Sequence, residues 1–269
     1  MSHQSQRRVG LVGHGAIGSV VAESLRDAAV PGAVLAGVLD PERPARDVPV
    51  DDVDELVARA DIIVEAAGPD ALRAVAEKVL AAGRTLVVLS IGAFTDPPTW
   101  RLLEEDHAGE IVLCSGALGG LDIIRAARLA GPVNSARLVT RKKPTALLQP
   151  WMSDEQASSL RGLREEEAPA SVFAGSARDA ARLFPQNLNV AASTAVTVGG
   201  WDVVSVELLA DPSATHTVHE LRVDTAVGAY HIRVENLPSP SNPATSGVVP
   251  YAVLRTLRDL VGSGAPRFG

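Results

Sequence analysis

The chain has 269 residues, which is enough for two modest domains or one large one. Its 46% hydrophobic and 21% charged residues exclude a disordered chain and are ordinary for a globular enzyme. The net charge of −7 argues against nucleic acid as the main partner, because phosphate binding calls for a basic surface.

The single cysteine, Cys114, excludes an internal disulfide and any multi-cysteine metal site, and we expect no metal. The first residues lack the apolar core of a signal peptide, and no uninterrupted apolar stretch reaches the roughly 18 residues of a membrane span. We therefore expect a cytoplasmic protein that does not enter the membrane.

A glycine-rich stretch at residues 9–18, VGLVGHGAIG, follows an apolar run and precedes a segment with helical spacing. Gly13, Gly15 and Gly18 have the G-x-G-x-x-G spacing, with Ala16 and Ile17 inside it. In a strand-turn-helix unit these glycines allow a tight turn, close approach of a pyrophosphate, and packing of helix on strand. The stretch predicts a dinucleotide site, although glycines after a strand also serve as plain turn residues.

A second apolar run, residues 33–39, ends at Asp40, about 20 residues beyond the last glycine, where such folds bind the adenosine ribose. Asp40 favours NAD. Arg43 and Arg46 follow closely and are suited to a 2′-phosphate, so NADP stays open beside NAD.

The first half of the chain alternates apolar segments of strand length with segments of helical spacing, most clearly at residues 71–82. The predicted strands are residues 9–12, 34–39, 62–65, 85–89 and 111–114. This alternation indicates a Rossmann-type, doubly wound parallel sheet. Ala67 and Gly68 follow the third strand, where small residues let a cofactor lie close to the main chain.

After a glycine-rich hinge at residues 115–120, the pattern turns toward alternating strands. These are predicted at residues 135–141, 201–210, 216–224 and 228–235, with helices at 121–129, 177–184 and 190–198 and a loop or short solvated helix within 153–167. The pattern favours an α+β domain with a largely antiparallel sheet and one exposed face. We expect a dinucleotide-binding domain at 1–118, completed by a C-terminal helix within 245–269, and a catalytic, substrate and oligomerisation domain at 119–244.

Several polar residues of the second half suit proton transfer and the binding of an anionic ligand. His219 has a side chain whose ordinary pKa lies near working pH, as a proton carrier needs. His216, three positions earlier, would point to the opposite face of a strand. The cations Arg141, Lys142 and Lys143 suit substrate carboxylates, or form a solvated basic edge.

Four segments carry a resemblance to one family: TRKKP at 140–144, LFPQNLNVAAS at 183–193, ADPSATHTVHE at 210–220 and NLPSPSNPATS at 236–246. Together with the glycine fingerprint and SGALGG they resemble the L-aspartate dehydrogenases, in order and through nearly the whole chain. The resemblance implies NAD(P)-dependent interconversion of L-aspartate with iminosuccinate, which hydrolyses to oxaloacetate and ammonia. It implies a role in pyridine-nucleotide synthesis or in aspartate breakdown.

Residue by residue, the resemblance places the active-site histidine at His219 and a cofactor-binding asparagine at Asn189; Asn187 is a neighbouring candidate for the same role. Another cofactor position falls at Ile123, where the family pattern has a small residue. A contact through main-chain atoms would survive that change.

Two departures remove positive charge. The family pattern has an Arg-Asn pair where this chain has His216-Thr217, and often a lysine where it has Ala244. A histidine holds a carboxylate only when protonated, and without the bidentate fork of arginine. Of the properties that the resemblance implies, the substrate is therefore the one that fits these residues least well.

Three functions remain at this stage. The first is L-aspartate dehydrogenase, with aspartate, oxaloacetate and ammonia as its small molecules. The second is a dehydrogenase or imine reductase for another amino acid or amine on the same scaffold. The third is a nucleotide sensor without turnover, which would have no use for a proton carrier. Because relatives are oligomeric and one sheet face is free, we expect a homodimer or a larger homo-oligomer.

Overall fold

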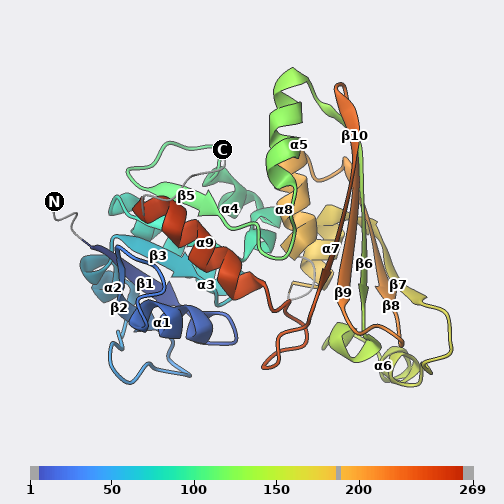
Figure 1. The fold of residues 1–269 in the computed structure, drawn as a ribbon, viewed down its shortest axis with the longest axis horizontal. Helices are drawn as coiled ribbons and strands as arrows, with labels where there is room; N and C mark the ends of the chain where they lie inside the picture. The colour runs from blue at the N-terminus through green and yellow to red at the C-terminus, as the bar shows by residue number, and fades with distance from the viewer. Residues whose placement is uncertain (1–5, 186–188, 263–269) are drawn as a thin grey trace. The chain divides into compact units, whose positions relative to one another are not determined.

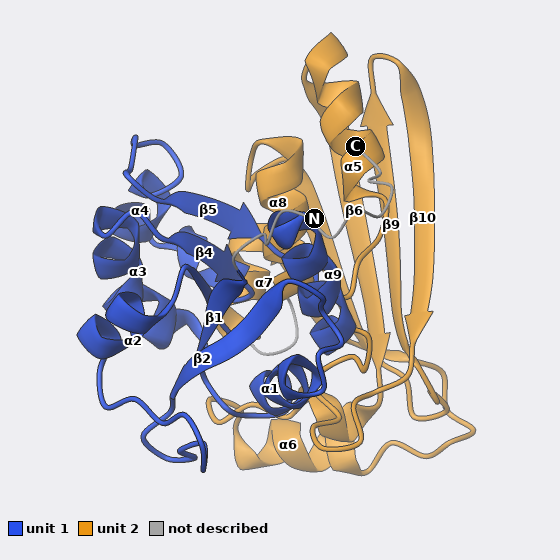
Figure 2. Cartoon of the chain, turned by 60° about the vertical axis from the view of Figure 1, so that its left-hand side comes forward, with its two compact units in different colours: residues 1–116, 249–269 blue, residues 117–248 orange. Residues whose placement is uncertain are grey.

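The computed structural model describes residues 6–185 and 189–262, and the chain divides into two compact units. Unit 1 comprises residues up to 116 together with the segment from 249 onward, and unit 2 comprises residues 117–248. Figure 2 colours the two units separately. The chain therefore leaves its first unit, builds the second, and returns.

Unit 1 contains a five-stranded parallel sheet in the order β2-β1-β3-β4-β5. Its strands are β1 (Arg7–Val12), β2 (Ala33–Leu39), β3 (Ile62–Glu65), β4 (Thr85–Val88) and β5 (Glu110–Leu113). Its helices are α1 (Gly18–Arg26), α2 (Val53–Arg59), α3 (Pro69–Ala81), the 3-10 helix η1 (Ile91–Thr95), α4 (Pro97–Arg101) and α9 (Val249–Val261). The predicted doubly wound sheet is confirmed.

Helices cover both faces of this sheet (Figure 2). Val9 and Val64 share one buried cluster with Val253 and Leu257 of α9, and α1 contributes to the same cluster. On the other face, a Cβ added to Gly10 would lie 2.7 Å from Leu56 of α2, so this helix packs directly on β1. Burial on both faces explains why the strands read as continuous apolar runs.

Unit 2 contains a second five-stranded sheet in the order β10-β9-β6-β8-β7. Its strands are β6 (Val133–Lys142), β7 (Ala170–Ser176), β8 (Val204–Ala210), β9 (Thr217–Thr225) and β10 (Gly228–Asn236). Its helices are α5 (Leu121–Ala127), η2 (Arg128–Ala130), η3 (Pro144–Leu147), α6 (Asp154–Arg161), α7 (Ala177–Leu183) and α8 (Asn189–Val198). All pairings are antiparallel except that of β6 with β8, which confirms the largely antiparallel sheet.

The second sheet has two unlike faces. Burial alternates strictly along β8 and β9, and α7 and α8 pack on the inner, buried face while the outer face is open (Figure 1). Side chains of β6, β8 and β9 on the inner face are therefore largely shielded from water. Polar residues of unit 2 can therefore form one site only if their side chains lie on the same face of this sheet.

Local differences from the predicted elements have physical causes. The helix expected over 121–129 ends at Ala127 and tightens into a 3-10 turn before Gly131. The strand expected from 201 begins at Val204, because the preceding residues form a turn. The solvated segment at 153–167 contains α6, which begins with a capping box of Ser153 and Gln156. No helix among the described residues is long and apolar enough to cross a membrane.

Candidate active site

The glycine-rich loop joins β1 to α1, and each glycine has a separate role. Gly13 has a φ of +97°, and a Cβ there would lie 2.9 Å from the main-chain carbonyl of Ala66. A Cβ on Gly18 would overlap the carbonyl oxygen of Gly13. A Cβ on Gly15 would meet only the tip of the Arg43 side chain, at 3.1 Å. The loop is thus closely packed at two glycines, while at Gly15 only a flexible side chain stands in the way of a pyrophosphate.

Asp40 ties this loop to the end of β2. Its Oδ2 accepts the His14 N–H at 2.7 Å, and its Oδ1 accepts the N–H groups of Glu42 and Arg43 at 3.0 and 2.9 Å. Burial alone would raise the pKa of Asp40, but these backbone donors and the charge of Arg43 outweigh it and lower the pKa. Asp40 is therefore a carboxylate beside the loop, and its outer lone pairs are suited to ribose hydroxyls.

Arg43 places a positive charge next to that carboxylate. Its side chain reaches toward Gly15, and its carbonyl oxygen lies 3.0 Å from His14 Nδ1. Arg46 is exposed. A carboxylate favours a free ribose and a guanidinium favours a 2′-phosphate, so this corner has the groups for either coenzyme.

The ends of β3 and β4 are joined through Glu65, a fully buried carboxylate. Its Oε1 accepts the N–H groups of Ala67 and Gly68 and the hydroxyl of Ser90, and its Oε2 accepts the Ser90 N–H. Burial raises the pKa of Glu65, opposed by these donors. The sequence predicts a coenzyme role for Ala67 and Gly68 but none for Glu65, whose signal was an acidic residue at the end of a buried strand.

His219 lies on the inner face of unit 2, where 1% of its surface is exposed. It stands directly opposite Thr140 in the pairing of β9 with β6, and its Nδ1 lies 2.9 Å from the Thr140 hydroxyl. Burial, and then the charge of Lys142, lower the pKa of His219 to about 3. The imidazole is therefore neutral and has one nitrogen engaged.

Lys142 projects from β6 on the same face, two residues after Thr140. It is 3% exposed, and burial lowers its pKa to about 8. Its Nζ donates a hydrogen bond to the main-chain carbonyl of Ala244 at 2.7 Å. A buried ammonium on the same sheet face as a neutral histidine is suited to a carboxylate ligand.

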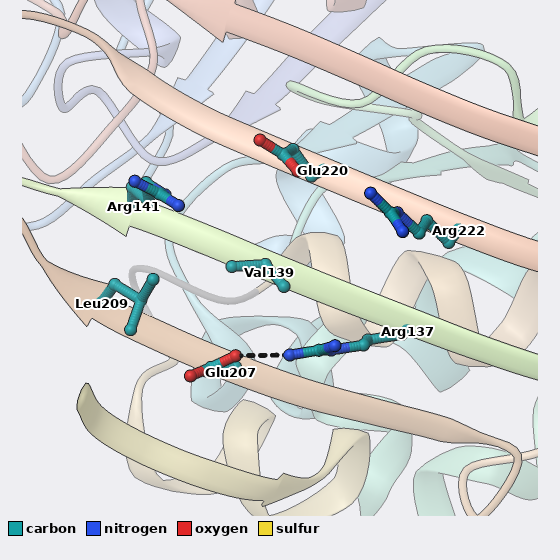
Figure 3. Close-up of a pocket in the computed structure, with 7 residues that line it drawn as sticks. All are labelled: Arg137, Val139, Arg141, Glu207, Leu209, Glu220 and Arg222. Atoms are coloured by element: carbon teal, nitrogen blue, oxygen red, sulfur yellow. Dashed lines mark hydrogen bonds and ion pairs between the residues drawn. The ribbon is translucent and has the colours of Figure 1, made fainter. Parts of the chain in front are cut away.

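The other predicted substrate residues lie elsewhere. Arg141 points to the opposite, outer face of the sheet, where it lines a pocket of about 350 Å³ with Glu220 (Figure 3). Lys143 is exposed and His216 is half-buried, and the His216 ring accepts or donates one bond with Thr215. The predicted cluster is thus divided by the alternation of the strand, and only Lys142 shares a face with His219.

Two predicted cofactor residues lie on helices of unit 2. Ile123 is 46% exposed on α5, and Asn189 is the first residue of α8, where its carbonyl accepts the Ser193 hydroxyl at 3.0 Å. Asn187 lies outside the described residues. Within the described part of the chain, no three His, Cys, Asp or Glu side chains are grouped as metal ligands.

Comparison with known proteins matches both halves of the chain to dehydrogenase families. Residues 122–260 match the family described as aspartate dehydrogenase, C-terminal, and residues 13–110 match the NAD binding domain of homoserine dehydrogenase. L-aspartate dehydrogenase 3 of Bordetella bronchiseptica is 35% identical over 97% of each chain. L-aspartate dehydrogenase of Ruegeria pomeroyi is 35% identical over 97% of this chain and 95% of its own.

Among solved structures, the aspartate dehydrogenase of Thermotoga maritima matches with a TM-score of 0.75 and 27% identity, covering 98% of this chain and all of that one. A hyperthermophilic archaeal homoserine dehydrogenase shares the fold at a TM-score of 0.59 and 12% identity. With its NAD-binding domain and these relatives along nearly its whole length, the chain is an oxidoreductase that belongs to the aspartate dehydrogenase family.

Proposed function

We propose that this protein is an NAD(P)-dependent L-aspartate dehydrogenase, which interconverts L-aspartate with iminosuccinate and so with oxaloacetate and ammonia. One observation carries the proposal: the buried group of Thr140, Lys142 and His219 lies inside the region that matches the aspartate dehydrogenase family. Unit 1 binds the dinucleotide, and unit 2 supplies the residues that act on the substrate.

The glycine loop, Asp40 and the turn at Ala67 and Gly68 fit a dinucleotide, because only the flexible tip of Arg43 lies near the main chain at Gly15, which a pyrophosphate needs to approach. Ala16 and Ile17 continue this loop into α1. Ile123 and Asn189 are further coenzyme-binding residues, on the basis of the family resemblance. When bound, the nicotinamide accepts or returns the hydride, and the protein supplies orientation and charge.

His219 takes a proton from the substrate ammonium at Nε2. A neutral imidazole can accept a proton, and burial, which lowers the pKa of His219 to about 3, favours the neutral form at working pH. Lys142 binds a substrate carboxylate through its buried ammonium.

The substrate itself adjusts the basicity of His219. L-Aspartate brings two carboxylates, and a negative charge close to an imidazole stabilises its protonated form. Neutralising the Lys142 charge with one carboxylate also removes a cause of the lowered pKa. Binding of L-aspartate therefore raises the pKa of His219 and makes it a stronger base in the complex, in which it accepts the proton.

Lys142 also supplies a positive charge near Ala244, where the family pattern often has a lysine. The ammonium of Lys142 donates to the carbonyl of Ala244, so a cation lies against the main chain of the segment that often has a lysine in the family pattern. A positive charge is therefore present beside this segment. Arg141, Lys143 and His216, the other substrate candidates, would contribute only long-range attraction from outside the inner face.

The outer face of the second sheet suggests a homodimer or larger homo-oligomer. Arg137, Arg141 and Arg222 lie on it beside Glu207 and Glu220 (Figure 3), so the face carries both signs of charge. An isologous contact requires a surface that complements itself, and a mixed-charge face meets that requirement. The cytoplasm is the proposed location, and the lone Cys114 is consistent with a reducing compartment.

The function is tested by following oxidation of NADH and NADPH with ammonia and oxaloacetate, beside a panel of other 2-oxo acids and ketones. Selective turnover of oxaloacetate supports the proposal. Turnover of another carbonyl compound instead would assign a different amino acid or amine on the same scaffold. Coenzyme binding without any turnover would indicate a nucleotide sensor.

A further inference from the structure

Thr140 and His219 form a contact that is fixed by the sheet itself. They are direct cross-strand partners in the antiparallel pairing of β6 with β9, which brings their Cβ atoms within roughly 5 Å in such a pair. Both are buried, with exposures of 0% and 1%, and the Thr140 hydroxyl lies 2.9 Å from His219 Nδ1. The imidazole is therefore held by a strand and not by a loop.

This contact divides the two ring nitrogens into different roles. Nδ1 is engaged by Thr140, and Nε2 has no hydrogen-bond partner among the described residues. A neutral imidazole carries its proton on one nitrogen and a lone pair on the other. A hydroxyl can either donate or accept, so the distance alone does not assign the tautomer.

The charge of Lys142 bears on the choice between the tautomers. Burial, and then this charge, lower the pKa of the imidazole, and an ammonium is a donor without acceptor capacity. A nearby cation attracts a lone pair and repels an N–H group. On Nε2, which has no other partner in the described part of the chain, it therefore favours the lone pair. Because the Thr140 hydroxyl oxygen can accept a hydrogen bond from Nδ1–H, this charge favours the tautomer with the lone pair on Nε2.

We propose that Thr140 is a positioning residue that accepts a hydrogen bond from Nδ1–H of His219, and so keeps Nε2 free as the base. The inference rests on the proposed function for its catalytic consequence, but the tautomer itself is a property of the protein alone. Many functional histidines form a hydrogen bond through the ring nitrogen that does not react, and the partner in that bond fixes the ring orientation and the nitrogen that carries the proton. Thr140 is such a partner for His219.

The first measurement is a long-range ¹H–¹⁵N NMR spectrum of the imidazole side chains of the full-length protein, assigned through His219→Gln. We expect His219 to be protonated at Nδ1 and bare at Nε2 from neutral pH down to mildly acidic pH. A proton on Nε2 would overturn the inference. This result does not depend on substrate, so it stands apart from any failure of the proposed function.

The second measurement compares Thr140→Val, which has nearly the same shape without the hydroxyl, with Thr140→Ser, which keeps it. Thr140→Val should mix the two tautomers and lower kcat by about 10- to 100-fold with little change in KM, whereas Thr140→Ser should keep the wild-type tautomer and pH profile. Thr194→Val is the matched control, because Thr194 is equally buried but bonds to Val190 of its own helix.

Equal losses in Thr140→Val and Thr140→Ser would assign the effect to packing and overturn the inference. Wild-type turnover and tautomer in Thr140→Val would also overturn it. If Thr140→Val does not fold, the wild-type spectrum and the rescue by serine decide the question. If no variant or wild type turns over oxaloacetate, the proposed function fails while the spectra still test the tautomer.

Discussion

Glu65 holds Ser90 at two points, through Oε1 to the hydroxyl at 2.8 Å and through Oε2 to the main-chain N–H at 3.0 Å. The same carboxylate accepts the N–H groups of Ala67 and Gly68. One buried side chain thus fixes the turns that follow two neighbouring strands, at the sheet edge where dinucleotides bind in doubly wound folds.

Glu65→Gln should weaken both folding and coenzyme binding. The amide nitrogen would face an N–H or hydroxyl donor, which leaves a buried donor unsatisfied at a cost of about 1–3 kcal/mol. Chemical denaturation and fluorescence titration with NADH measure the two effects. Glu77→Gln, an exposed change on α3, is the control. Unaltered NADH affinity in Glu65→Gln would show that this carboxylate does not order the coenzyme site.

Asp40 and Arg43 should affect the two coenzymes in opposite ways. Asp40→Ala should raise the Kd of NADH more than that of NADPH, because a carboxylate binds ribose hydroxyls and repels a 2′-phosphate. Arg43→Ala should raise the Kd of NADPH more than that of NADH. Arg46→Ala, also exposed, is the control for net charge. Equal weakening of both coenzymes by Asp40→Ala would limit Asp40 to its structural bonds with the loop.

Lys142→Met should raise the KM for oxaloacetate at least about 10-fold, the effect of losing one charge-assisted bond, and leave the Kd of NADH unchanged. Its neighbour provides the control: Lys143→Met removes the same charge from an exposed position. Steady-state kinetics at saturating coenzyme separate the two variants. If both variants raise KM equally, the substrate is attracted by the summed positive charge at the end of β6, and Lys142 does not bind the substrate directly.

His219 should make the fold sensitive to mild acid. Its pKa is about 3 when folded and near 6.5 when unfolded, so the unfolded chain binds the extra proton between these values. The free energy of unfolding should therefore fall as pH falls below 6.5, by up to about 1.4 kcal/mol per pH unit from this residue. Denaturation curves at several pH values should show a shallower dependence in His219→Gln. His216→Gln, changed at a half-buried histidine outside the inner face, should retain the wild-type slope.

Much of the fold follows from local patterns in the sequence. The apolar runs of unit 1 predict its strands to within a residue or two, because a parallel sheet buried on both faces needs uninterrupted apolar residues. β7 is not predicted, since a bulge between Ser171 and Phe173 breaks its alternation. The parallel pairing of β6 with β8 is not predicted either, because the choice of partner strand depends on the whole topology.

The candidate site is less visible in the sequence for the same reason. Alternation along β6 separates Arg141 from Lys142, but the sequence does not tell which of the two faces is the covered one. The bond between Thr140 and His219 joins residues 79 positions apart, and depends on a register that no short motif encodes. His219 as the proton carrier is a proposal drawn from its chemistry and from the family resemblance.

The central claim is tested most directly by the product. Wild-type protein is incubated with oxaloacetate, NADH or NADPH, and ¹⁵N-ammonium, and the products are separated by chiral chromatography and analysed by mass spectrometry. We predict ¹⁵N-labelled L-aspartate in amounts equal to the coenzyme oxidised. Coenzyme oxidation with malate as the product and no label in aspartate would contradict the claim, because the protein would then reduce the ketone and not the imine.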